Sequence, residues 1–106
     1  MTAAPVVSTR ARAHLRSLAH HLEPTVQIGG DGLSESVRSA IEVALDQHEL
    51  IKVRLGPAFT GERREAAREL AESVRADLTQ VIGRVIVLYR PRKKPDPKRP
   101  SIVLPS

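Results

Sequence analysis

The chain has 106 residues, 41% hydrophobic and 27% charged, which suits one soluble domain with a single modest core. It lacks cysteine, which excludes disulfides, thiolate metal sites and cysteine nucleophiles. No apolar run is long enough to cross a membrane and no secretory signal pattern is visible, so we expect a cytoplasmic protein. The formal net charge of +5 favours a polyanionic partner, either a nucleic acid or an anionic membrane surface.

The excess charge is confined to the end of the chain. Residues 1–89 contain 11 basic and 11 acidic residues, whereas residues 90–106 contain six basic residues and only Asp96 as an acid. Five prolines in that segment predict an exposed, polyproline-like arm. We therefore divide the chain into a flexible N-terminus (1–7), a folded domain (8–90) and a basic proline-rich tail (91–106). The tail either improves solubility or contacts phosphates, which we favour; Ile102, Val103 and Leu104 could also dock on the domain.

Apolar spacing predicts seven elements in chain order. The first is a helix over residues 8–21, with Ala11, Leu15, Leu18 and Leu22 as its apolar stripe. A strand over 25–28 and a glycine turn lead to a helix over 33–48, with Ser34 as N-cap and Ala40 and Ile41 inward. A strand over 50–55 and a helix capped by Thr60 and ending near Asp77 follow. Strands over 79–82 and 85–89 complete the order, joined by a type II′ turn at Gly83-Arg84.

The order α-β-α-β-α-β-β indicates an α/β fold. Strand–helix–strand alternation implies parallel neighbours, and the terminal hairpin adds an antiparallel pair.

Three segments resemble a known family: Leu18-Ala19-His20 leading to Ile28-Gly29-Gly30-Asp31-Gly32-Leu33; His48-Glu49-Leu50-Ile51-Lys52-Val53; and Val81-Ile82-Gly83 followed by Val87-Leu88-Tyr89-Arg90-Pro91. Their order and spacing over residues 8–91 resemble the CRM domain (chloroplast RNA splicing and ribosome maturation), specifically the single-domain bacterial YhbY-like proteins. The resemblance implies a non-catalytic RNA-binding module that joins precursors of the large ribosomal subunit as an assembly factor. It also implies a mixed four-stranded sheet with helices packed on it, similar to the C-terminal domain of translation initiation factor three.

The same resemblance implies a KH-like GxxG loop, with Gly29 and Gly32 at the two glycine positions. Glycines let backbone amides approach a phosphate closely, and this loop also opens a helix, whose N-terminus favours anions. Gly30 and Asp31 occupy the middle positions. Asp31 departs from the basic or neutral polar residue common there and would repel a phosphate unless it turns away, for example to cap the helix.

Further RNA-binding candidates are cations of the strands, the tail and the first helix, although Lys52 and Arg54 could instead pair with surface Glu or Asp residues. Lys52 and Arg54 alternate with an inward apolar set, so we expect their part of the sheet to be open. The other candidates are Arg84, Arg90, Arg92, Lys93, Lys94, Arg10, Arg12 and Arg16. Arg63, Arg64 and Arg68 alternate with glutamates and are interpreted as a solvated helix face. With only Phe59 and Tyr89 as aromatics, we expect recognition of RNA backbone and shape rather than of base sequence.

Signals for catalysis and metal binding are missing from the sequence. His14, His20, His21 and His48 lack zinc-site spacing, and we interpret His20 and His21 as residues that close the first helix. No nucleophile or acid–base constellation is recognisable. We therefore predict a monomeric, non-catalytic RNA-binding protein without cofactor, metal or membrane partner. The alternative is a protein-interaction module whose basic tail binds an acidic partner.

Overall fold

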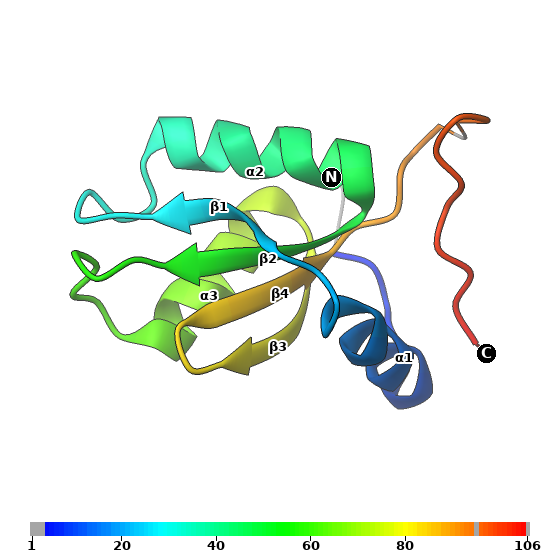
Figure 1. Cartoon of the computed structure of the whole chain (residues 1–106), viewed down its shortest axis with the longest axis horizontal. Coiled ribbons are helices and arrows are strands. Elements are labelled where there is room, and N and C mark those ends of the chain that lie inside the picture. The colour runs from blue at the N-terminus through cyan, green and yellow to red at the C-terminus, as the bar shows by residue number, and fades with distance from the viewer. Residues whose placement is uncertain (1–3, 95, 106) are drawn as a thin grey trace.

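The computed structural model describes residues 4–94 and 96–105, which form three helices and four strands (Figure 1). In chain order the elements are α1 (Thr9–Ala19), β1 (Pro24–Ile28), α2 (Glu35–His48), β2 (Leu50–Leu55), α3 (Arg63–Val74), β3 (Asp77–Ile82) and β4 (Val85–Tyr89). This order confirms the α/β fold predicted from the sequence.

The four strands form one mixed sheet in the order β1-β2-β4-β3. Strands β1 and β2 are parallel because α2 carries the chain back between them, and the β3–β4 hairpin adds two antiparallel pairings. The hairpin turn has Gly83 at φ +57°, whereas Arg84 keeps a negative φ, as a type II′ turn requires. The β1–α2 loop, the β2–α3 loop and this hairpin all lie at the left end of the molecule in Figure 1.

Two apolar clusters hold the fold together, one on each face of the sheet. The larger cluster joins α2 and α3 to one face through side chains such as Ile41, Leu70 and Val53. The smaller one, here called the α1 cluster, is made of Leu15, Ala19, Leu50, Val87 and Tyr89. Because α1 is only 11 residues long, its cluster covers one end of the second face and leaves the rest of that face open.

The apolar stripe predicted for the first helix is wrong in two positions. Leu18 and Leu22 are 38% and 37% exposed, and the buried positions of α1 are Ala11, Leu15 and Ala19. The helix ends at Ala19, so Leu22 lies beyond it and cannot continue a helical stripe.

The third helix begins and ends inside its predicted limits. Glu62 caps it in place of Thr60, and its Oε2 accepts the Glu65 N–H at 2.6 Å. The backbone N–H group of Glu65, and to a smaller extent that of Arg64, donates to the Glu62 carboxylate and holds its pKa below the usual value of a glutamate. The helix ends at Val74 because Arg75 adopts the left-handed conformation at φ +56°. Strand β3 therefore begins at Asp77, two residues before the predicted start of this strand. In α2, Ala40 is exposed instead of inward.

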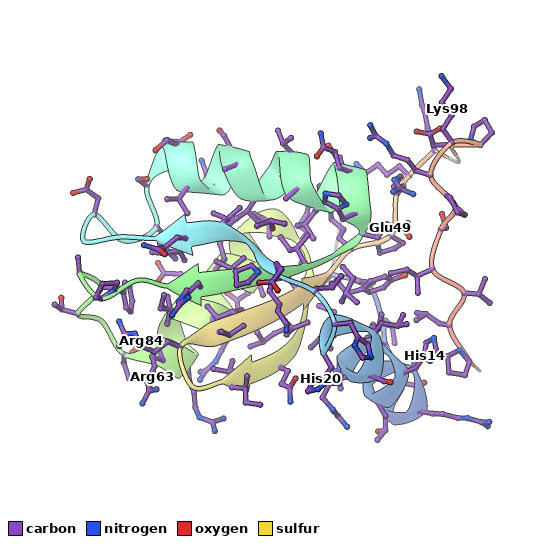
Figure 2. The ribbon with its side chains drawn as sticks, viewed as in Figure 1. His14, His20, Glu49, Arg63, Arg84 and Lys98 are labelled. Carbon is purple, nitrogen blue, oxygen red and sulfur yellow. The ribbon has the colours of Figure 1, made fainter. Side chains whose placement is uncertain are left out.

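The C-terminal tail is docked and is not the free polyproline-like arm that its prolines predict. Ile102 and Leu104 pack against the α1 cluster, which confirms the docking alternative, although Val103 is 85% exposed. Glu49 anchors the tail: it is 1% exposed, and its carboxylate accepts the N–H of Arg92 at 2.6 Å and that of Ile102 at 2.8 Å. The tail is therefore fastened at two points, Arg92 and Ile102, and Lys93, Lys94 and Lys98 lie between them in the chain. Figure 2 labels Lys98 and the anchor Glu49.

Candidate nucleic-acid interface

The loop Gly29–Gly32 is an open turn between β1 and α2. The Gly32 N–H donates to the Gly29 carbonyl oxygen at 3.1 Å, which closes the turn. Gly32 has φ +67°, in the left-handed region that favours glycine. A Cβ at Gly29 would meet no atom within 4 Å, and the φ of Gly29 lies outside the left-handed region. A side chain at Gly29 would therefore be tolerated by the fold and would project into open space beside the loop.

The loop leads into the N-terminus of α2. Ser34 is the N-cap, as predicted, and its hydroxyl accepts the Val37 N–H at 3.3 Å. The backbone N–H groups of Glu35 and Ser36 have no acceptor among the described residues, so they are available to an anion. Asp31 does not cap the helix, which was one way for it to turn away from a phosphate: it is exposed and makes no hydrogen bond within the described part of the chain.

Strand β2 carries two cations on the open face of the sheet. Ile51, Val53 and Leu55 are buried in the larger cluster, and Lys52 and Arg54 project from the opposite face. Arg54 is exposed and Lys52 is partly covered, and neither forms an ion pair with a described residue. We call these two residues the β2 cations. Their face of the sheet is open there, which confirms the prediction made from the alternation.

Two of the predicted cations are held by atoms of the domain itself. The Arg12 guanidinium pairs with buried Asp77 at 2.7 Å, a hydrogen bond that holds the pKa of Arg12 above its usual value. Arg84 donates to the carbonyl oxygens of Leu55 at 3.0 Å, Gly56 at 2.6 Å and Phe59 at 3.1 Å. Arg84 therefore fixes the β2–α3 loop beside the hairpin, at the end of the molecule where Figure 2 labels it.

Two further cations join the end of β4 to the helices. Arg90 is 15% exposed and donates to the Glu42 carboxylate and the Val74 carbonyl, both at 2.8 Å, and to Asp46 at 3.0 Å. The guanidinium of Arg92 donates to the last carbonyls of α2, including that of Asp46 at 2.8 Å. Both residues have structural contacts that sequence reasoning missed, because their acceptors lie more than 40 residues away or in the backbone.

The remaining predicted cations are exposed to solvent. Arg10 and Arg16 lie on α1, and Lys93 and Lys94 lie between the two anchors of the tail. None of these four side chains forms an ion pair with another described residue. The available cations are thus the β2 cations on the open sheet face, Arg10 and Arg16 on α1, and the lysines of the tail.

Sequence reasoning missed a groove beside the end of α1. This groove, here called the α1 groove, has a volume of 440 Å³ and lies between α1 and the open sheet face. Its walls include Arg16, His20, His21, Lys52 and Gln80. His20 is the C-cap of α1, where the sequence places it, but no sequence pattern links it to β3. Only the period-two alternation of β3 could have placed Gln80 on this face, and a bulge between Leu78 and Gln80 disturbs that alternation.

Within residues 4–94 and 96–105, no cluster of three or more His, Cys, Asp or Glu side chains could hold a metal ion. None of the helices described has the length and apolar character to cross a membrane.

Comparison with known proteins assigns the chain to a family. The model of the CRS1/YhbY (CRM) domain matches residues 7–90. The solution structure of the Staphylococcus aureus protein SAV1595 is similar, with a TM-score of 0.75 and 36% identity over 94% of this chain and 100% of that one. The chain belongs to the CRS1/YhbY (CRM) domain family, which confirms the resemblance seen in its sequence motifs.

Curated relatives share most of the chain length. An RNA-binding protein of Haemophilus influenzae is 41% identical over 88 residues, covering 83% of this chain and 89% of that protein. The "Probable RNA-binding protein PA4753" of Pseudomonas aeruginosa is 40% identical over 85 residues, covering 80% and 82%. The "Probable RNA-binding protein YqeI" of Bacillus subtilis is 35% identical over 89 residues, covering 84% and 93%.

Proposed function

We propose that this protein is a non-catalytic RNA-binding protein that binds ribosomal RNA in precursors of the large ribosomal subunit and assists their assembly. Membership of the CRM family and the RNA-binding names of its relatives support the RNA-binding role. The observation that carries the RNA-binding role is that the β2 cations have no ion-pair partner among the described residues and lie on the strand paired with β1, which leads into the open glycine loop. We further propose that the protein acts in the cytoplasm as a monomer.

The binding mode follows from where the available donors lie. Strand β2 runs parallel to β1, so the C-terminal end of β2 lies at the same end of the sheet as the Gly29–Gly32 loop, which follows β1. Gly56, which follows β2, donates its N–H to the Ile28 carbonyl at 2.8 Å and so keeps the two loops together. An RNA backbone can therefore contact the loop and the N-terminus of α2 with one phosphate group and the β2 cations with others.

Salt dependence and one loop variant test this binding mode. If five or six phosphates are contacted, log K against log salt should have a slope of roughly −4, at about −0.7 per contact in single strands. Gly29→Asp should weaken binding about tenfold, because it adds a negative charge where the phosphate lies. Its melting temperature should stay that of the wild type, since the added side chain meets open space. Fluorescence anisotropy with a ribosomal RNA fragment measures the affinity.

Asp31→Lys is the matched control at the neighbouring exposed position. It should tighten RNA binding, because the substitution replaces a repulsive charge by an attractive one. If it weakened binding as much as Gly29→Asp does, the phosphate would not lie at this loop. A salt slope near zero would contradict electrostatic binding altogether.

The ribosomal part of the proposal needs a separate experiment. Crosslinking in cells followed by sequencing of the attached RNA should recover large-subunit ribosomal RNA and its precursors. Sedimentation distinguishes the alternative, in which the basic tail holds an acidic protein. Co-migration with the particles that survives RNase digestion would favour that protein contact, whereas release by RNase would favour RNA.

A further inference from the structure

The α1 groove has a wall of nitrogen-bearing side chains without a carboxylate. Its ionisable lining residues are Arg16, His20, His21 and Lys52, contributed by the end of α1 and by β2. Lys52 is only partly exposed and has no ion-pair partner among the described residues. A cation that has lost part of its hydration without gaining a partner favours an anionic ligand.

The nearby carboxylate of Asp77, on β3, does not neutralise the cations of the groove. Asp77 pairs with Arg12 at 2.7 Å and accepts the Thr79 hydroxyl at 2.9 Å. Its negative charge is therefore paired with Arg12, and the charged residues that line the groove, Arg16 and Lys52, are both basic.

The groove also has apolar and planar surfaces, which a binding site for a simple anion would not need. Val87 is buried in its floor, and Ile82 is 58% exposed at its side. The imidazole rings of His20 and His21 lie 5.5 Å apart between centroids and are inclined by 80°, so they present a face and an edge in different directions. The side-chain amide of Gln80 is partly buried and has no hydrogen-bond partner among the described residues.

These surfaces together match a nucleotide more closely than they match phosphate or an apolar side chain. A nucleotide combines an anion, a flat ring that stacks on aromatic or imidazole faces, and edges that pair with an amide. A volume of 440 Å³ is in the range of small-ligand sites.

We propose that the α1 groove binds one unpaired nucleotide of the RNA, with its phosphate at Lys52 and Arg16 and its base against the imidazole rings and Ile82. This inference rests on the proposed RNA-binding function and adds to it a second contact, which selects RNA with a bulged or single-stranded nucleotide. The glycine loop then binds backbone of any sequence, and the groove decides which structured sites bind more tightly.

Two hairpin RNAs test the proposal, one with a fully paired stem and one with a single bulged nucleotide in the same stem. Wild type should bind the bulged hairpin about tenfold more tightly, as one stacked base provides. The double variant His20→Ala with Gln80→Ala should reduce this ratio to about one. His14→Ala removes another histidine of α1, which Figure 2 shows on the side of the tail, and should leave the ratio unchanged.

The glycine loop separates this proposal from the proposed function. Gly29→Asp should weaken binding of both hairpins by the same factor. Equal binding of the two hairpins by wild type, or a preference that survives in the double variant, would overturn the groove proposal alone. Failure to bind either hairpin would contradict RNA binding itself.

A second readout does not depend on the variants. Adding the bulged hairpin should shift the imidazole NMR resonances of His20 and His21, and those of His14 should stay in place. A separate titration with free adenosine monophosphate is the control for this experiment. If it produced the same shifts at the same concentration, the ligand would be a soluble nucleotide, and the proposal would be wrong.

Discussion

Arginine residues that cannot be distinguished in the sequence have different roles in the folded protein. Arg54 lies on the open sheet face without an ion-pair partner among the described residues, whereas Arg90 is bound to two carboxylates and two backbone carbonyls. Counting positive charges along the chain cannot distinguish these cases, because what distinguishes them is the acceptors that folding brings near.

Substitution of these two arginines by methionine should separate stability from RNA affinity. Arg90→Met should lower the free energy of unfolding by about 2 kcal/mol, because it leaves the Val74 carbonyl and the Glu42 carboxylate without their donor. Arg54→Met should leave that free energy unchanged and weaken RNA binding severalfold. Urea unfolding and anisotropy titrations measure the two effects. An Arg90→Met protein of wild-type stability would show that these contacts contribute little.

Strand β4 links the two apolar clusters and carries a titratable group at its end. Ile86 and Leu88 enter the larger cluster, and Val87 and Tyr89 enter the α1 cluster. Burial raises the pKa of the Tyr89 phenol, and the nearby Glu49 charge raises it further. A phenol that must stay neutral in the folded state makes this strand sensitive to high pH.

Alkaline titration should reveal this sensitivity. Because the folded-state pKa of Tyr89 is raised, its contribution to stability is fully present below the pKa of an unfolded tyrosine, about 10. That contribution is lost as the pH rises through the higher folded-state pKa. Melting temperatures between pH 8 and pH 11 should therefore fall more for wild type than for Tyr89→Phe. Parallel curves for the two proteins would exclude Tyr89 as the cause.

At the level of elements, local sequence patterns predict strands and turns better than helix ends. β2 and β4 have their predicted limits, since alternation and the Gly83 turn determine them. The helix ends depend on single residues, such as the left-handed Arg75 and the Glu62 cap, which propensity does not indicate. The glycine loop and the β2 cations were predictable because a short motif and period-two alternation are local. The α1 groove was not, because its lining comes from α1, β2, β3 and β4.

For the whole molecule, the docked tail changes how its charge can be studied. Deleting the tail removes three lysines, and it also uncovers the α1 cluster and removes both backbone donors of buried Glu49. A loss of RNA affinity after truncation would therefore mix electrostatics with unfolding.

Charge neutralisation and truncation should thus differ in outcome. Replacing Lys93, Lys94 and Lys98 by glutamine should make the salt slope less steep by about 2, at about −0.7 per contact, without changing the melting temperature. Truncation after Pro91 should also lower the stability by about 3 kcal/mol, from lost apolar burial and an unpaired carboxylate. Calorimetry and salt titrations of both variants measure this. An unchanged slope in the triple variant would show that the tail lysines do not contact RNA.

The docking of Ile102 and Leu104 also has a consequence for biosynthesis. Translation produces α1 first and these two residues after every strand and helix of the domain. The inward side of α1, with Leu15 at its centre, therefore remains incompletely covered while the sheet and the other two helices are already emerging. A nascent chain released before residue 104 would therefore leave part of the α1 cluster exposed, and exposed apolar surface favours aggregation.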